Sequence, residues 1–135
     1  MRTHLLLAAL AVAAFTAIPM GCGSSTGKGP GGRELTLVRP ADQTLSRGES
    51  NRVAVAIARD EFEGPVRVTF EGLPDGVRVA EGDTSIPADA NVMNFTLVAD
   101  ATAEIVSDKP VKVVVTGPDN LTTSEIFEIT VKEKG

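Results

Sequence analysis

Very few side chains in this sequence could take part in chemistry beyond acid–base exchange. The 135 residues contain one histidine, His4, and one cysteine, Cys22, with no tryptophan or tyrosine. His4 stands beside an apolar run, Leu5–Ile18 (LLLAALAVAAFTAI), in the first 21 residues. If residues 1–21 are removed as a leader, no histidine remains and Cys22 is the only cysteine. Histidine-based triads and His/Cys zinc sites are then excluded by composition.

Serine, lysine and carboxylate side chains remain plentiful, so a Ser-Lys pair or a carboxylate pair is conceivable. No part of the sequence places such residues at a nucleophile elbow or in an identifiable cleft. Solvated turn serines and surface carboxylates are the ordinary explanation of these residues. We therefore predict that the protein is not an enzyme, with no catalytic residue and no cofactor.

Cys22 itself is the one residue with a specific predicted chemistry. Arg2 and the apolar run are typical of a signal peptide, and the run is shorter than the roughly 20 residues that span a membrane. The segment Pro19-Met20-Gly21-Cys22 follows directly and resembles the bacterial lipoprotein lipobox. That resemblance implies cleavage before Cys22 and its acylation, with palmitate for example. An ordinary signal peptide with an unmodified thiol and a retained membrane helix are the alternatives.

The mature chain that would result is acidic and has no nucleic-acid signature. Its 12 basic and 18 acidic residues give a net charge of −6. Without a basic stripe or aromatic platform, nucleic acid is not an expected partner, and lipid alone would hold the protein at a membrane. Gly23 replaces the aspartate of the best-known inner-membrane retention signal, which favours the outer membrane or cell surface over the inner membrane.

Two further segments follow from composition and periodicity. Residues 22–33 continue from Cys22 into GSSTGKGPGGR, which predicts a flexible, disordered linker. Residues 34–134 show apolar residues at every second position, separated by Gly/Pro/Asp turns. This predicts one all-β domain, an immunoglobulin-like two-sheet sandwich of about seven strands. The expected strands are 35–38, 52–59, 66–71, 77–79, 93–97, 111–115 and 124–132.

The clearest unit is Pro65–Val79, PVRVTFEGLPDGVRV, which predicts a strand, a Leu73–Gly76 turn and a second strand. Pro74 fixes one φ angle of this turn and Gly76 permits a left-handed one. Residues 41–50 and 100–110 are expected to be connections, and Ile86 is expected to reach the core from a loop.

With these residues in view, the domain resembles extracytoplasmic immunoglobulin-like domains of planctomycete-type bacterial envelope proteins. The segments that carry the resemblance, between Leu35 and Val131, are LSRGESNRVAVAIAR, GPVRVTFEGLPDGVRV, SIPADANVMNFTLVAD and VKVVVTG. The resemblance implies a module that spaces, presents or binds, with no catalytic residues.

A calcium site is the main alternative role. In immunoglobulin-like connectivity three acidic loops would meet at one end of the sandwich with few cations nearby, and Ca²⁺ takes six to eight oxygen ligands. The first strand starts at that end, so the acidic end is expected to face the membrane. The carboxylates concerned are Asp60, Glu61, Glu63, Glu81, Asp83, Asp89 and Asp119.

The prediction is thus a lipid-anchored envelope protein acting as a non-catalytic structural or protein-interaction module, with other envelope proteins as partners. The alternative is a calcium- or ligand-binding accessory subunit of a larger envelope complex.

Overall fold

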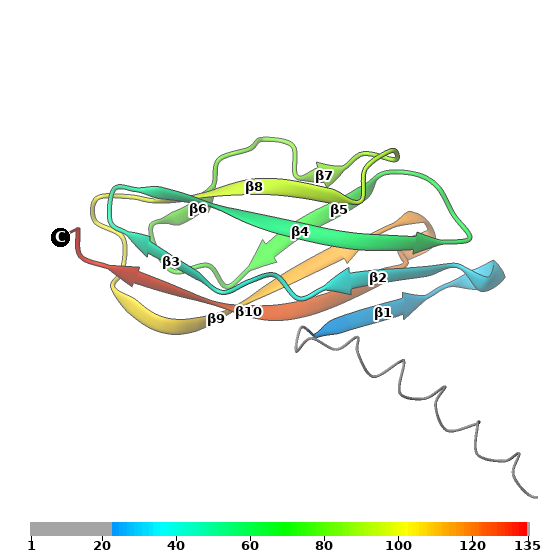
Figure 1. The fold of residues 1–135 in the computed structure, drawn as a ribbon, viewed down its shortest axis with the longest axis horizontal. Coiled ribbons are helices and arrows are strands. Elements are labelled where there is room, and N and C mark those ends of the chain that lie inside the picture. The colour runs from blue at the N-terminus through cyan, green and yellow to red at the C-terminus, as the bar shows by residue number, and fades with distance from the viewer. Residues whose placement is uncertain (1–22, 135) are drawn as a thin grey trace, which may run out of the picture.

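The structure is a computed structural model that describes residues 23–134. The predicted leader and the predicted lipidation site at Cys22 lie outside the described residues. Ten strands and two short 3-10 helices, η1 (Pro30–Gly32) and η2 (Pro118–Asn120), form two layers (Figure 1). Across residues 23–134 no helix has the length and hydropathy needed to cross a membrane.

Each layer is a five-stranded sheet. The first has the order β1-β2-β4-β8-β6 and the second β3-β10-β9-β5-β7. Neighbouring strands are antiparallel, apart from the parallel pair of β3 and β10. The strands of the first sheet are β1 (Ser24–Lys28), β2 (Glu34–Val38), β4 (Ser50–Asp60), β8 (Val92–Ala99) and β6 (Val77–Val79). Those of the second are β3 (Gln43–Ser46), β10 (Thr122–Lys132), β9 (Val106–Thr116), β5 (Val66–Glu71) and β7 (Ser85–Ile86).

The immunoglobulin-like arrangement is recognised from the sheet order. Strands β2, β4, β8 and β6 face β10, β9 and β5, which is the four-plus-three arrangement of that sandwich. The predicted fold class, an all-β two-sheet sandwich, is confirmed. All seven predicted strands are present, and β1, β3 and β7 extend the sheets.

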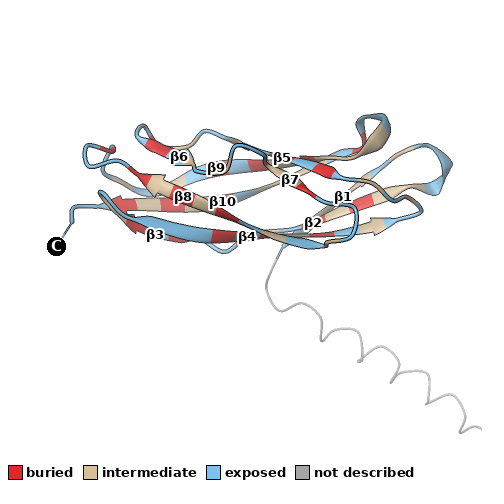
Figure 2. Cartoon of the chain, turned by 90° about the horizontal axis from the view of Figure 1, so that it is seen from above, coloured by how far each residue is buried: buried red, intermediate tan, exposed pale blue. Residues whose placement is uncertain are grey.

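The core lies between the sheets because apolar residues alternate with polar ones along the long strands (Figure 2). Phe70 contacts both Phe95 and Phe127 edge-on, with ring centroids 5.9 and 6.2 Å apart. Ile86 is fully buried, as predicted, but it lies on the short strand β7 and not in a loop. The other fully buried side chains include Leu35, Leu37, Val53, Val55, Val66, Val68, Leu97, Val111, Val113, Val115 and Ile129.

Strand β1 contradicts the prediction of a disordered linker over residues 22–33. Ser24–Lys28 pairs along its whole length with β2, from Ser24 opposite Val38 to Lys28 opposite Glu34. The Ser25 hydroxyl donates to the Ser124 carbonyl oxygen (2.8 Å) and accepts from the Thr123 hydroxyl (2.7 Å). Composition was misleading because this strand buries no side chain fully. Backbone pairing and short hydroxyl side chains hold it.

A glycine lets β1 approach the second sheet closely. A Cβ atom at Gly27 would overlap the carbonyl oxygen of Thr122 on β10. Glycine removes that atom and so permits the approach. In consequence β1 covers the seam between β2 and β10, with contacts to strands in both sheets.

The two expected connections also contain strand residues. Residues 43–46 form β3, which runs parallel to β10 at the edge of the second sheet. β9 begins at Val106, and a register shift between Ile129 and Val131 on β10 accommodates the added pairing. Such a shift is invisible to a period-two pattern, because a bulge breaks the alternation.

The expected orientation toward a membrane loses its basis. β2 does begin at the acidic end of the sandwich, but β1 precedes it and runs the opposite way. The carbonyl oxygen of Gly23 accepts a hydrogen bond from the Arg39 amide (2.8 Å), next to the far end of β2. The described chain therefore begins along the edge of the sheet and not at its acidic end.

Candidate functional site

Three loops and the η1 turn meet at one end of the sandwich, and arginines hold them together. Arg33, which follows η1, forms an ion pair with Asp119 on η2. Arg59 lies near the C-terminal end of β4. Its side chain bonds to the loop before β5 and to the loop before β8. These are the loops that were predicted from the sequence to meet, but two cations, Arg33 and Arg59, lie among them.

Arg59 is the most heavily bonded side chain at this end. Its Nε donates to the carbonyl oxygen of Gly64 (2.8 Å), Nη1 to that of Ala90 (2.7 Å) and Nη2 to that of Pro87 (2.8 Å). The planar guanidinium of arginine carries five N–H donors, so one side chain can bond several carbonyl oxygens at once. The residue therefore fixes two loops to β4. Sequence reasoning missed it, although a charged residue at the next inward position after Val55 and Ile57 was the available signal.

A hollow of about 440 Å³ opens beside these loops, on the outer surface of the second sheet. Its floor is a row of three residues paired across strands, since Arg67 lies opposite both Thr116 and Ser85. The walls are Glu63, Gly64, Pro65, Gly117 and Pro118. The lining has one cation, Arg67 on the floor, and one carboxylate, Glu63 in the wall, and among these residues no nucleophile is paired with a base.

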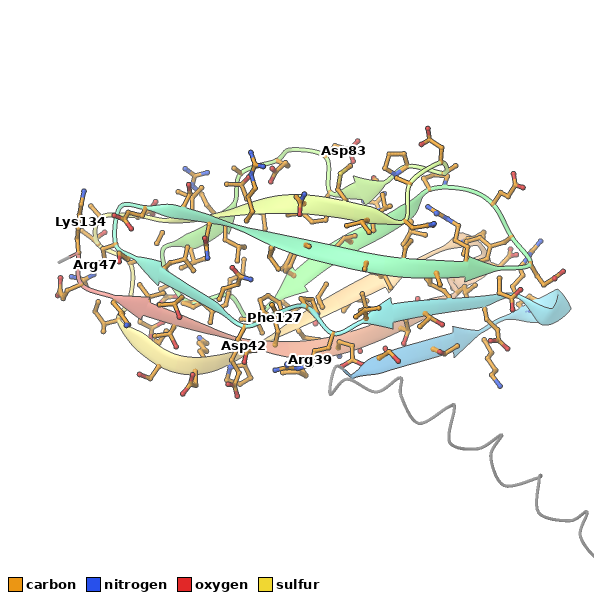
Figure 3. The ribbon with its side chains drawn as sticks, in the orientation of Figure 1. Arg39, Asp42, Arg47, Asp83, Phe127 and Lys134 are labelled. Atoms are coloured by element: carbon orange, nitrogen blue, oxygen red, sulfur yellow. The ribbon has the colours of Figure 1, made fainter. Side chains whose placement is uncertain are left out.

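The carboxylates of the predicted calcium site do not gather. Asp119 is paired with Arg33, and Asp83 accepts a hydrogen bond from the Ser85 hydroxyl (2.7 Å). Within residues 23–134 no group of three or more Asp, Glu, His or Cys side chains is arranged to hold a metal ion. The expectation of a loop end with few cations is wrong, because Arg33 and Arg59 both lie there. Figure 3 shows Asp83 on the long segment that precedes β8.

Glu81 lies apart from that end and has a structural role. The Thr96 amide donates to Oε1 (2.8 Å) and the Thr96 hydroxyl to Oε2 (2.9 Å). These two bonds, the backbone one first, hold the pKa of Glu81 below its usual value of 4.5, and nearby Arg52 adds a small lowering. The ionised carboxylate thus fastens residues 80–84 to β8.

The pKa of Glu81 is lower in the folded state than its usual value of 4.5, so the ionised carboxylate stabilises the fold at pH values above 4.5. This stabilisation is lost as the pH falls through the lowered pKa. We expect an NMR titration to place the Glu81 pKa below 4.5. Thr96→Val removes the hydroxyl bond and keeps the amide bond, so the pKa should rise part of the way back. Thr69→Val, at an exposed position on β5, is the control and should leave the Glu81 pKa unchanged. If the Glu81 pKa is the same with and without Thr96→Val, the Thr96 hydroxyl does not lower it, and this prediction is wrong.

No protein-family model matches the sequence, and a search of curated proteins finds no match either. Solved structures with similar chains include titin domain M7, at 13% identity and a TM-score of 0.43, covering 82% of this chain and 99% of that one. The BIgI domain of the beta protein from S. agalactiae, solved bound to CEACAM1, aligns at 16% identity and a TM-score of 0.43, covering 76% and 99%.

Proposed function

We propose that this protein is a lipid-anchored component of a bacterial cell envelope, in which one immunoglobulin-like sandwich serves as a non-catalytic structural or protein-interaction module. Acylated Cys22 would be the anchor, and other envelope proteins would be the partners. The outer membrane or the cell surface is the proposed location, since Gly23 follows the cysteine.

One observation carries the anchor, namely a lone cysteine directly after a signal-type apolar run. The start of the fold supports it. β1 begins at Ser24, two residues after Cys22, so cleavage at Cys22 would leave every strand of the described sandwich in the chain. The module would then be held against the membrane surface, with only Gly23 between the acylated residue and β1.

The non-catalytic part of the proposal is supported by inventory and geometry together. The chain from residue 22 onward has no histidine, and the hollow beside Arg67 holds no paired nucleophile and base. Within residues 23–134 the core between the two sheets takes up most of the large apolar side chains, and Val38, Val92, Ile105 and Ile126 stay exposed. The surface is left for contacts with other molecules.

Mass spectrometry of the mature N-terminus tests the anchor. We expect the chain purified from membranes to begin at Cys22 and to carry the mass of acyl chains. Cys22→Ser should block processing, so the variant should keep residues 1–21. Gly23→Ala is the control: a Cβ there meets only ordinary contacts, the nearest at 3.7 Å, and processing should continue. A free Cys22 thiol, or cleavage at another position, would overturn the proposal.

A further inference from the structure

The outer face of the first sheet is unusually free of charge at its centre. Ala54, Ala56 and Ala58 all point outward from β4, because Val53, Val55 and Ile57 point inward. Across the sheet, Ala54 lies opposite Asn94, Ala56 opposite Val92 and Ala58 opposite Thr36. Val92 is 52% exposed and Val38, further along β2, 38% exposed. We call this surface the alanine face, defined by Thr36, Val38, Ala54, Ala56, Ala58, Val92 and Asn94.

The outer face of the second sheet shows what an ordinary solvated surface looks like in this protein. There Glu71 lies opposite Lys112, and Arg67 stands two residues before Thr69 on the same strand. Glu128 adds another charge on β10. Charges at such positions keep a sheet face in water and discourage association. The alanine face lacks them, so solvation alone does not explain its composition.

Charges of opposite sign close the two ends of the alanine face. At one end Glu34 and Asp60 lie directly opposite each other, a like-charge pair with Lys28 on the far side of Glu34. At the other end Arg52 and Arg78 point outward from β4 and β6, and the Glu81 carboxylate near Arg52 offsets one of these two positive charges. Neither Arg52 nor Asp60 belongs to any ion pair formed within the described part of the chain. Opposed carboxylates cost free energy that a cation between them would relieve.

We propose that the alanine face binds a second copy of this chain, with a two-fold axis in the interface that crosses the strands near Ala56. Such an axis lays the acidic end of each copy over the basic end of the other, so both charge contacts form at once. This is the self-complementary pattern of an isologous interface. Small side chains let two sheets approach face to face at about 10 Å or less.

The size of the surface sets the strength of the contact. β4 contributes nine residues at about 3.3 Å each and is flanked by β2 over one half and by β8 over the other, so a width of about two strands at 4.8 Å gives roughly 300 Å² on each copy. Stable interfaces cover about 800 Å² per partner, so this dimer is weak and reversible in solution. It deepens the interaction-module part of the proposed function and does not depend on the lipid anchor.

Disulfide cross-linking traps the pairing without requiring high affinity, whether the chain is recovered with membranes or in solution. In the full chain, Ala56→Cys places a thiol near the axis, and mild oxidation should yield a covalent dimer. The matched control is Thr69→Cys, on the exposed outer face of β5, which should cross-link several-fold less. The unaltered chain reports on Cys22: a dimer there means a free Cys22 thiol, which counts against the anchor and not against this face.

Charge reversal then tests the orientation. Adding Arg52→Glu to Ala56→Cys should lower the yield several-fold, and further adding Asp60→Arg should restore it. Circular dichroism and thermal unfolding check that each variant is folded. Equal yields from Ala56→Cys and Thr69→Cys, or no response to the charge exchange, would overturn the proposal.

Discussion

Replacing Phe127 with alanine is expected to lower the free energy of unfolding by about 3–5 kcal/mol. Phe127 is fully buried on β10 and contacts Phe70 edge-on, and Phe70 in turn contacts Phe95. The substitution removes a large apolar side chain and leaves a cavity that the flanking strands cannot close. Since domains of this size are stable by about 5–15 kcal/mol, this one change would remove a large part of the total.

Chemical denaturation followed by circular dichroism measures this effect. The neighbouring residue supplies the control: Ile126 points outward from the same strand and is 46% exposed, so Ile126→Ala should change stability by about 0.5 kcal/mol or less. Equal losses for the two variants would mean that β10 does not present Phe127 to the core in the register seen here.

The second large effect is expected at Gly76, in the turn between β5 and β6. Its φ is +85°, and a Cβ atom there would lie 2.7 Å from the Ala103 Cα. Gly76→Ala therefore combines left-handed backbone strain with displacement of the residue 100–105 loop. The two costs together come to about 2–5 kcal/mol.

Gly72 separates these two costs. Its φ is +82°, but the nearest atom to an added Cβ is the Pro110 carbonyl oxygen at 3.8 Å. Gly72→Ala should therefore cost only the backbone strain, about 1–2 kcal/mol. Thermal or denaturant unfolding of both variants would show the difference. If Gly72→Ala lowers the free energy of unfolding as much as Gly76→Ala does, then Ala103 moves aside at no cost and the predicted clash is absent.

Gly76 also shows how far the sequence predicts this fold and where it stops. Leu-Pro-Asp-Gly predicts a turn with a left-handed glycine, and the φ of Gly76 agrees. The packing of that turn on the 100–105 loop involves residues more than 20 positions away. The Asp100 amide donates to the Gly76 carbonyl oxygen (2.8 Å), and no local pattern announces such a bond.

The longer strands with repeated apolar side chains were predictable, and the strands that lack such a repeat were not. The period-two pattern of Phe127 and Ile129 identifies β10 directly. β1 and β3 lack that pattern, because β1 pairs mainly through its backbone and β3 has four residues. Arg59 was missed for a related reason: its partners are carbonyl oxygens, which every residue has, and its position shows only in three dimensions.

The placement of β1 has a mechanical consequence. A pull on the chain at Gly23, directed away from the sandwich, acts first on the pairing of Ser24 with Val38, then on that of Ser25 with Leu37, and so on toward Lys28. Each step breaks few bonds, and β1 contributes no fully buried side chain. Residues 23–33 would extend by roughly 36 Å when released, before the load reaches β2 and the core. With the proposed anchor at Cys22, release of β1 would therefore lengthen the tether while the core stays folded.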